Sequence, residues 1–280
     1  MTLDRPAPTR PPAVPATRLA AEGLTLRYDD RTVAEDLSVA VPDDRFTVIL
    51  GPNACGKSTL LRALAGLLAP AQGRVLLDGA PLLSLSAKER ARRLALLPQT
   101  MSAPEGITVQ ELVQRGRFAH QRVLRRHSES DRRAVADALE ETQVADLANR
   151  RIDELSGGQR QRVWIAMTLA QDTPLVLLDE PTTFLDLPHQ IEVLNVLHRL
   201  VARGRTVVAV LHDLNLAARY ADHVVALRDG AVVATGSPRD TITAPLMREV
   251  FALDATVLPD PLTGAPMVVP ADTRSGVPVS

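Results

Sequence analysis

The sequence is poor in aromatic residues, cysteine and long apolar runs, and its charges nearly balance. Only 2% of its 280 residues are aromatic and the net charge is -1, so it lacks the stacking side chains and the overall positive charge typical of nucleic-acid-binding proteins. The single cysteine, Cys55, cannot form an internal disulfide, which fits a reducing compartment. No apolar run approaches the roughly 20 residues that cross a bilayer. We therefore expect a soluble chain with an aliphatic core and no nucleic-acid partner.

The two ends of the sequence differ in composition from its middle. Residues 1–17 are rich in proline and lack the apolar segment of a secretory signal, so we expect a disordered leader and a cytoplasmic chain. Residues 256–280 also carry several prolines, and we expect a hairpin and a tail there. The length between these ends is enough for one α/β core with an inserted subdomain.

The first half of the sequence changes pattern twice. Short alternating segments between Leu19 and Val41 predict an antiparallel β region. The apolar run from Phe46 to Leu50 then enters a glycine loop, and helical character follows from Thr59 to Ala65. From about Gln99 to Arg162 the sequence has helical periodicity. We expect a helical subdomain over about residues 99–165.

The second half predicts the rest of the core. Leu175 to Leu178 and Thr206 to Leu211 are continuous apolar runs, typical of parallel strands buried on both faces. Ile191 to Val201 lies between them and is expected to form the crossover helix. Val224 to Leu227 and Ala231 to Ala234 flank a hairpin turn. The order of these segments predicts an α/β protein.

A glycine-rich phosphate-binding motif follows the strand that ends at Leu50. Residues 51–58 fit the pattern G-x-x-x-x-G-K-[ST], in which backbone N–H groups and a helix N-terminus bind phosphate oxygens. Lys57 adds a positive charge, and Ser58 would place its hydroxyl on Mg²⁺. We therefore expect ATP and Mg²⁺ as ligands. The candidate nucleotide-binding residues of this motif are Gly51, Pro52, Asn53, Ala54, Cys55, Gly56, Lys57, Ser58 and Thr59.

Two adjacent carboxylates follow the apolar run that ends at Leu178. Side chains alternate along a strand, so Asp179 and Glu180 point in different directions and can have different roles. Asp179 is suited to hold Mg²⁺ through water, whereas Glu180 can polarise the water that attacks the γ-phosphate.

The segment from Leu155 to Gln159, Leu-Ser-Gly-Gly-Gln, resembles the signature of the ATP-binding cassette family, and the resemblance covers nearly the whole chain. In that family the signature of one subunit closes on the γ-phosphate bound by the other. Free N–H groups and the dipole of the helix expected at 159–170 would face that anion. The alternative interpretation is a simple helix cap. The candidate residues are Ser156, Gly157, Gly158 and Gln159.

The resemblance implies a P-loop NTPase (RecA-like) fold: a mixed sheet core with an N-terminal antiparallel β subdomain and an inserted α-helical subdomain. The cassette itself would span residues 18–255.

Two polar residues match further elements of the family. Gln99 matches the glutamine loop that senses Mg²⁺ and the γ-phosphate, and His212 matches the switch histidine that contacts the γ-phosphate. The resemblance thus implies a catalytic set of Lys57, Gln99, Glu180 and His212, and a metal-binding set of Ser58, Gln99 and Asp179.

Two more residues match the family but have alternatives. Asp186 matches the loop that crosses the dimer interface beside the attacking water; the alternative is a helix cap before Pro188. Tyr28 matches the aromatic residue that stacks on adenine; the alternative is a role in the core.

The middle of the glycine-rich loop contains one departure from the family. Ala54 stands where the family usually has glycine, and alanine costs on the order of 1 kcal/mol if the backbone there needs φ > 0. The next residue, Cys55, lies where a helix terminus would lower its thiol pKa. A bulky thiol reagent would then inactivate the protein, and MgATP would protect it. The alternative is a small filler residue.

Four segments resemble those of bacterial ferric siderophore importers, namely residues 51–57, 113–118, 181–186 and 211–215. The resemblance implies that the chain hydrolyses ATP to power uptake of an iron(III)–siderophore complex, with cobalamin and haem importers as near alternatives.

The same resemblance implies the partners. Two copies would form a head-to-tail dimer around two ATP molecules and bind integral membrane permease subunits at the cytoplasmic face of the membrane. A substrate-binding lipoprotein would act indirectly, through the permease. Gln99 and the surface around Glu111 to Phe118 would pass motion to the permease.

Two other classes of cassette ATPase share the nucleotide motifs. Chromosome-maintenance and repair ATPases separate these motifs by long coiled coils, and this sequence has no extended heptads. Translation-associated proteins usually carry two cassettes in one chain, and here there is one set of motifs.

Overall fold

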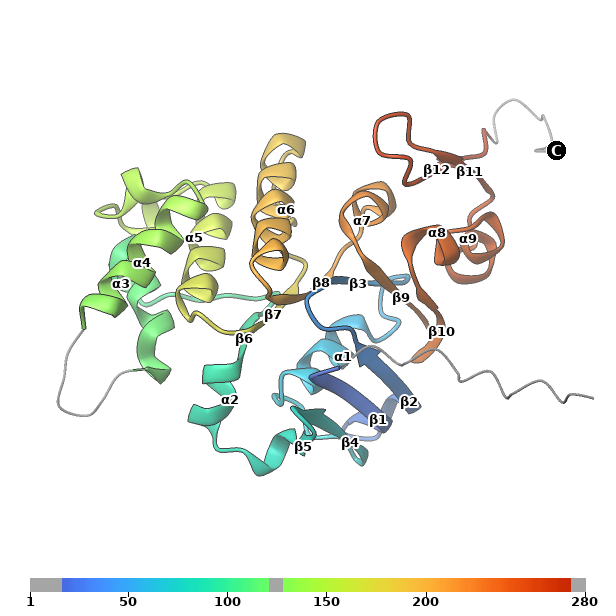
Figure 1. Ribbon diagram of the computed structural model, residues 1–280, viewed down its shortest axis with the longest axis horizontal. Helices are drawn as coiled ribbons and strands as arrows, with labels where there is room; N and C mark the ends of the chain where they lie inside the picture. The colour runs from blue at the N-terminus through green and yellow to red at the C-terminus, as the bar shows by residue number, and fades with distance from the viewer. Residues whose placement is uncertain (1–16, 121–127, 273–280) are drawn as a thin grey trace, which may run out of the picture.

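The computed structural model describes residues 17–120 and 128–272. A six-stranded mixed sheet forms its centre (Figure 1). Every neighbouring pair is parallel except the first two strands, which form an antiparallel hairpin. In spatial order the strands are β10 (Ala231–Gly236), β9 (His223–Arg228), β3 (Phe46–Leu50), β8 (Thr206–Val210), β7 (Leu175–Asp179) and β6 (Leu94–Leu97).

A second, antiparallel sheet lies below the central sheet in Figure 1. Between the two sheets lies α1 (Lys57–Leu64), whose leucines share one hydrophobic core with both. The strands of this second sheet, in spatial order, are β2 (Arg31–Val41), β1 (Leu19–Tyr28), β4 (Gln72–Leu77) and β5 (Ala80–Pro81).

The opposite face of the central sheet is covered by α6 (Leu187–Ala202) and α7 (Leu214–Tyr220) (Figure 1). The aliphatic stripe of α6, including Leu194 and Leu197, packs on β3 and β8 in a second large core. The two cores cover both faces of β3, β7 and β8, which explains why these strands are apolar at almost every position.

A helical subdomain lies at one end of the sheet (Figure 1). Its longest helix, α5, packs against the other two α-helices. The elements are α3 (Val109–Arg115), α4 (Glu129–Glu141) and α5 (Gly157–Ala170), with 3-10 helices η2 (Gly116–Ala119), η3 (Ala145–Leu147) and η4 (Ile152–Glu154).

At the other end of the sheet, two helices and a two-stranded hairpin follow β10 (Figure 1). They are α8 (Pro238–Thr241), α9 (Ala244–Phe251), β11 (Ala255–Pro259) and β12 (Pro266–Pro270). The connection between β5 and β6 contains η1 (Leu82–Ser84) and α2 (Ala87–Arg93).

The structure confirms the fold class: a mixed α/β core, an antiparallel β subdomain and an inserted group of helices. The helical region starts later than expected, because no helix forms between Gln99 and Val109. The sequence analysis did not identify β4, β5, β6, α2, α7, α8 or α9. Of the expected leader, residues 1–16 lie outside the described residues, as do residues 273–280 of the expected tail.

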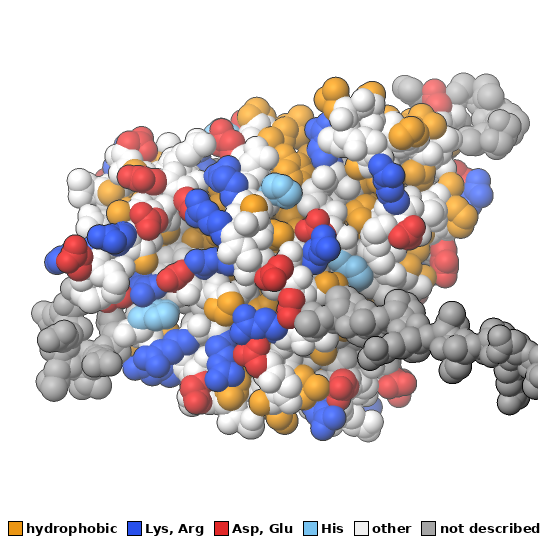
Figure 2. All heavy atoms as spheres, viewed as in Figure 1, with side chains coloured by type: hydrophobic (Ala, Val, Ile, Leu, Met, Phe, Trp, Pro, Cys, Tyr) orange, Lys and Arg blue, Asp and Glu red, His pale blue; other side chains and the backbone are white. Residues whose placement is uncertain are grey.

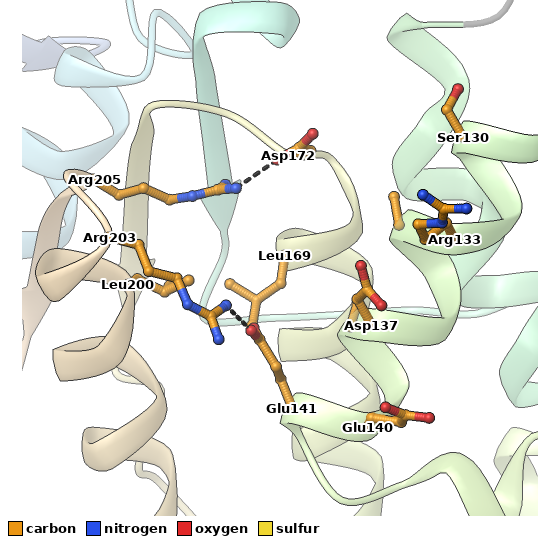
Figure 3. A pocket seen from close by; sticks show the side chains of 12 residues that line it. Ser130, Arg133, Asp137, Glu140, Glu141, Leu169, Asp172, Leu200, Arg203 and Arg205 are labelled. Carbon is orange, nitrogen blue, oxygen red and sulfur yellow. Dashed lines mark hydrogen bonds and ion pairs between the residues drawn. The ribbon is translucent and has the colours of Figure 1, made fainter.

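The helical subdomain and the core face each other across a hollow of about 500 Å³ beside α4. Two ion pairs, Arg205 with Asp172 and Arg203 with Glu141, connect the α6–β8 loop to the helical subdomain there (Figure 3). Figure 2 shows acidic and basic side chains interspersed over this side of the molecule. Within the described ranges, no helix is long and apolar enough to cross a membrane.

Candidate nucleotide-binding site

The glycine-rich loop joins the carboxyl end of β3 to the first turn of α1. Gly51 has φ +155°, and a Cβ atom there would lie 2.3 Å from the carbonyl oxygen of Leu227 in β9. Only glycine fits this close approach. Gly56, directly before α1, has φ +105°. The loop therefore turns tightly against β9 before it enters the helix, where free N–H groups can bind an anion.

Lys57 lies under this loop and is 5% exposed. Its Nζ donates hydrogen bonds to the carbonyl oxygens of Gly51 (2.8 Å) and Pro52 (2.7 Å). These neutral acceptors hold the ammonium group beside the loop. The oxygens of a bound phosphate are charged and would form stronger hydrogen bonds with it.

Ser58 and Asp179 bring two hard oxygen ligands together. The Ser58 hydroxyl donates to Asp179 Oδ1 over 2.8 Å. Burial raises the pKa of Asp179, although the hydrogen bond from Ser58 opposes this effect. A cation beside this buried carboxylate would stabilise its charged form, so the pair fits Mg²⁺. No cluster of three His, Cys, Asp or Glu side chains suited to a metal occurs in residues 17–120 and 128–272. Gln99, the third expected metal ligand, lines the same hollow as Ser58.

Glu180 and His212 follow two adjacent parallel strands, β7 and β8. His212 Nε2 lies 2.7 Å from Glu180 Oε1, and the Thr183 hydroxyl donates to Glu180 Oε2 over 3.2 Å. Glu180 has φ +55°, because the chain turns sharply as it leaves β7. The carboxylate is thus fixed by two partners.

One hollow of about 900 Å³ is lined by Lys57, Ser58, Glu180 and His212. The buried Asp179 is not among its lining residues. Tyr28 lies at the edge of the hollow, 40% exposed, and its hydroxyl accepts a hydrogen bond from Arg62. The structure therefore excludes the alternative of a core role for Tyr28. The lining residues are Tyr28, Arg31, Val33, Asn53, Ala54, Gly56, Lys57, Ser58, Thr59, Gln99, Glu180 and His212.

The sequence analysis did not identify Arg31, Val33 or Thr183 as site residues. Arg31 and Val33 begin the strand that pairs with the strand of Tyr28, so the turn between the two strands could have indicated them. Thr183 lies three residues after Glu180, where its hydroxyl reaches the carboxylate across a turn.

The signature residues lie elsewhere. Ser156 caps α5: its Oγ accepts from the Gln159 N–H, and the Gln159 side chain accepts from the Ser156 N–H. Gly157 lines a separate hollow of about 480 Å³, which it shares with Gln99 and Glu180. None of Ser156, Gly157, Gly158 and Gln159 lines the hollow that contains Lys57.

Asp186 also lies apart from that hollow. Its carboxylate caps α6 by accepting from the His189 N–H, and it contacts the His189 ring. The hydrogen bond from the His189 side chain lowers the pKa of Asp186. Within one chain, Asp186 therefore acts as a helix cap.

Two expectations for the loop are settled by its geometry. Ala54 has φ +62°, so the cost of alanine at a left-handed position applies. The expected lowering of the Cys55 pKa is wrong: burial raises it, and the attraction of Lys57 offsets this only partly. The thiol is packed against Gly51 in the core below the loop. Cys55 therefore acts as a small filler residue, not as a reactive group facing the nucleotide.

Known proteins resemble this chain over most of its length. The ABC transporter family model matches residues 34–183. The ferric enterobactin transport ATP-binding protein FepC of Escherichia coli is 52% identical over 254 residues, which are 90% of this chain and 94% of that protein. The hemin import ATP-binding protein HmuV of Streptomyces coelicolor is 44% identical over 267 residues, 95% of this chain and 94% of that protein.

A solved structure of a metal-chelate type ABC transporter, in an inward-facing conformation, superimposes with a TM-score of 0.79 at 28% identity. The match covers 93% of this chain and 100% of that one. Both the sequence and the fold therefore lead to one assignment: the chain belongs to the ABC transporter family, as one of its ATP-binding, ATP-hydrolysing proteins.

Proposed function

We propose that this chain powers a membrane importer of iron(III)–siderophore complexes, working as a peripheral subunit at the cytoplasmic face of the membrane. Two copies would bind two ATP molecules head to tail and act on integral permease subunits, which in turn receive cargo from a substrate-binding lipoprotein. Cobalamin and haem importers are the alternative assignments.

One observation carries the proposal of a shared site. The hollow that is lined by Lys57, Ser58 and the Glu180–His212 pair is not lined by any residue of the signature from Ser156 to Gln159. A helix N-terminus with an exposed glycine, Gly157, is nevertheless a suitable group for the γ-phosphate. A second copy in the opposite orientation would supply that helix end and cover the bound nucleotide.

The mechanism follows from the fixed groups. The loop N–H groups and Lys57 would hold the phosphates, while Tyr28 would stack on adenine. Ser58, Gln99 and Asp179 would hold Mg²⁺, which neutralises phosphate charge when bound. Glu180, oriented by His212 and Thr183, would accept the proton of the attacking water. ATP binding would close the dimer, and hydrolysis would reopen it.

The cargo is supported by the comparison of relatives. Identity is 52% to the ferric enterobactin protein and 44% to the hemin protein, over similar shares of the chain. Since a cassette does not contact its cargo, this support comes from resemblance to the relatives and not from residues that bind the cargo.

Uptake measurements test the cargo. In the source strain with this gene deleted, we expect loss of uptake of radiolabelled ferric enterobactin or a ferric hydroxamate, and rescue by the wild-type gene. A Glu180→Gln gene should not rescue, because the water would lack its base. Haem and cobalamin are measured in parallel. Unchanged siderophore uptake with loss of haem or cobalamin uptake would replace the assigned cargo.

The purified Glu180→Gln protein tests the mechanism separately. ATP should bind but not turn over, so size-exclusion chromatography with MgATP should show a stable dimer. A monomer under these conditions would contradict the role of Glu180 in hydrolysis within a closed dimer.

A further inference from the structure

The hairpin of β11 and β12, the C-terminal hairpin, is joined by side-chain contacts to α7, which begins two residues after His212. In Figure 1 it lies beside α7. Val268 of β12 is buried in the same core as Leu216 and Ala217 of α7. The hairpin therefore packs on an element of the nucleotide site that is distant from it in sequence.

Asn215 makes the main polar contact between the two elements. Its Oδ1 accepts the Val268 N–H over 2.7 Å, and its Nδ2 donates to the Val268 carbonyl over 3.3 Å. Both polar groups of one side-chain amide thus pair with both backbone groups of one β12 residue. Such two-point pairing fixes the orientation of a side chain better than one hydrogen bond does.

A second contact lies one turn further along α7. Arg219 pairs with Asp260 over 3.1 Å, and Asp260 is itself held in the hairpin turn by the N–H groups of Leu262 and Thr263. Asn215 and Arg219 are four residues apart and so lie on one face of the helix. The hairpin consequently holds α7 at both its first and its last turn.

The connection to His212 is short. Asp213 caps α7, accepting through Oδ1 from the N–H groups of Asn215 (2.9 Å) and Leu216 (2.8 Å). This capping residue directly follows His212 in the chain. The backbone of Asn215 is therefore held by Asp213 while its side chain is held by β12, and the ring of His212 projects from the end of this fixed turn toward Glu180.

We propose that Asn215 is a positioning residue for ATP hydrolysis, through which the C-terminal hairpin orients His212 toward Glu180. The inference rests on the proposed function, since it assumes that His212 assists hydrolysis. Loss of the Asn215 contacts should misplace His212 without affecting the loop around Lys57. The effect should therefore fall on kcat and not on the KM for ATP.

The test compares Asn215→Leu, His212→Ala and the double variant in ATPase assays of the purified full chain. We expect Asn215→Leu to lower kcat roughly ten- to hundredfold with an unchanged KM for ATP, because small misplacements of catalytic groups cost this much. On the His212→Ala background, Asn215→Leu should lower kcat no further. Asn215→Asp keeps the acceptor for the Val268 N–H and should be less impaired than Asn215→Leu.

Asn195→Leu is the matched control. It removes the amide that accepts a hydrogen bond from Tyr220, at the last residue of α7, and should keep wild-type kcat. Thermal melting of all variants shows whether Asn215→Leu is still folded at the assay temperature.

The inference would be overturned if folded Asn215→Leu kept wild-type kcat. It would also be overturned if Asn215→Leu lowered kcat by the same factor on the His212→Ala background as in the wild-type protein. If His212→Ala itself kept wild-type turnover, the role of His212 in the proposed function would be wrong, and with it the premise of the inference.

Discussion

At the residue scale, Ala54 occupies the left-handed backbone region in the middle of the phosphate-binding loop, with φ +62°. Glycine adopts this conformation without the steric cost that a Cβ atom brings. We expect Ala54→Gly to raise the free energy of unfolding by about 1 kcal/mol without weakening ATP binding. Urea unfolding and nucleotide titration measure the two quantities.

The matched control for this substitution is Ala63→Gly, inside α1 and 1% exposed. There glycine adds backbone entropy to the unfolded chain and removes a buried methyl group, so stability should fall by roughly 1 kcal/mol. Destabilisation by both substitutions would show that Ala54 carries no strain.

Cys55 gives a second residue-scale prediction. Burial keeps its thiol pKa above the ordinary 9.0, and only the thiolate reacts rapidly with alkylating reagents. At pH 8 the folded protein should react with iodoacetamide far more slowly than the chain in urea, with or without MgATP. All labelling reports this residue, since the chain has one cysteine. Fast labelling that MgATP prevents would place the thiol on the nucleotide face after all.

At the scale of elements, a buried ion pair anchors the turn that displays Phe118. Arg117 of η2 pairs with Asp131 of α4 over 2.9 Å, and both side chains are less than a tenth exposed. Arg117 also donates to the carbonyl oxygen of Ala170 at the end of α5. Phe118, the next residue, is 80% exposed. Three helical elements thus hold one turn rigidly, on the surface proposed to face the permease.

Removing the charge of Asp131 should be costly because it leaves a buried guanidinium without its partner. We expect Asp131→Asn to lower the free energy of unfolding by about 3–5 kcal/mol at neutral pH. The control is Glu129→Gln, whose pair with Arg133 is exposed on the same helix and should change stability by less than about 1 kcal/mol. Similar effects of the two would contradict the buried pair.

The pH dependence of this pair has a definite sign. Burial opposes ionisation of Asp131, but hydrogen bonds from Ser128 and Arg117 outweigh it and lower its pKa below the ordinary 3.8. The charge therefore stabilises the fold above that value and ceases to do so as the pH falls through the lowered pKa. The difference between wild type and Asp131→Asn should shrink below about pH 4, as acid unfolding would show.

At the scale of the whole molecule, the proposed shared site can be tested at Gly157. A Cβ atom built on Gly157 has no neighbour within 4 Å in the chain, so a large side chain there would point into open space. We expect Gly157→Arg to fold and bind ATP normally as a monomer. ATP hydrolysis should be lost, because the arginine would block closure against a second copy.

The matched control is Ala87→Arg, at the equivalent first position of α2, which is exposed and also directly follows the N-cap residue of a capping box. This variant should retain the wild-type ATPase rate. Full turnover by Gly157→Arg would show that the signature helix does not close on a partner's nucleotide.

The sequence by itself determined the chemistry of the phosphate site and the type of core. The spacing from Gly51 to Ser58 requires a strand, a tight loop and a helix, and the apolar runs at β7 and β8 can only be buried on both faces. Local patterns suffice there, because each interaction involves residues close in the chain. The hairpin of β9 and β10 was likewise visible as two short apolar segments around a turn.

Only the tertiary structure decided which distant residues meet. Parallel pairing of β7 with β8 brings His212 to Glu180, and no local pattern contains that contact. The thiol of Cys55 is packed beside Gly51, and burial outweighs the charge of Lys57 and the backbone hydrogen bonds in setting its pKa. The pairing of Asn215 with Val268 spans 53 residues. Such contacts depend on chain topology. They join residues that are far apart in the sequence, and sequence periodicity carries no information about them.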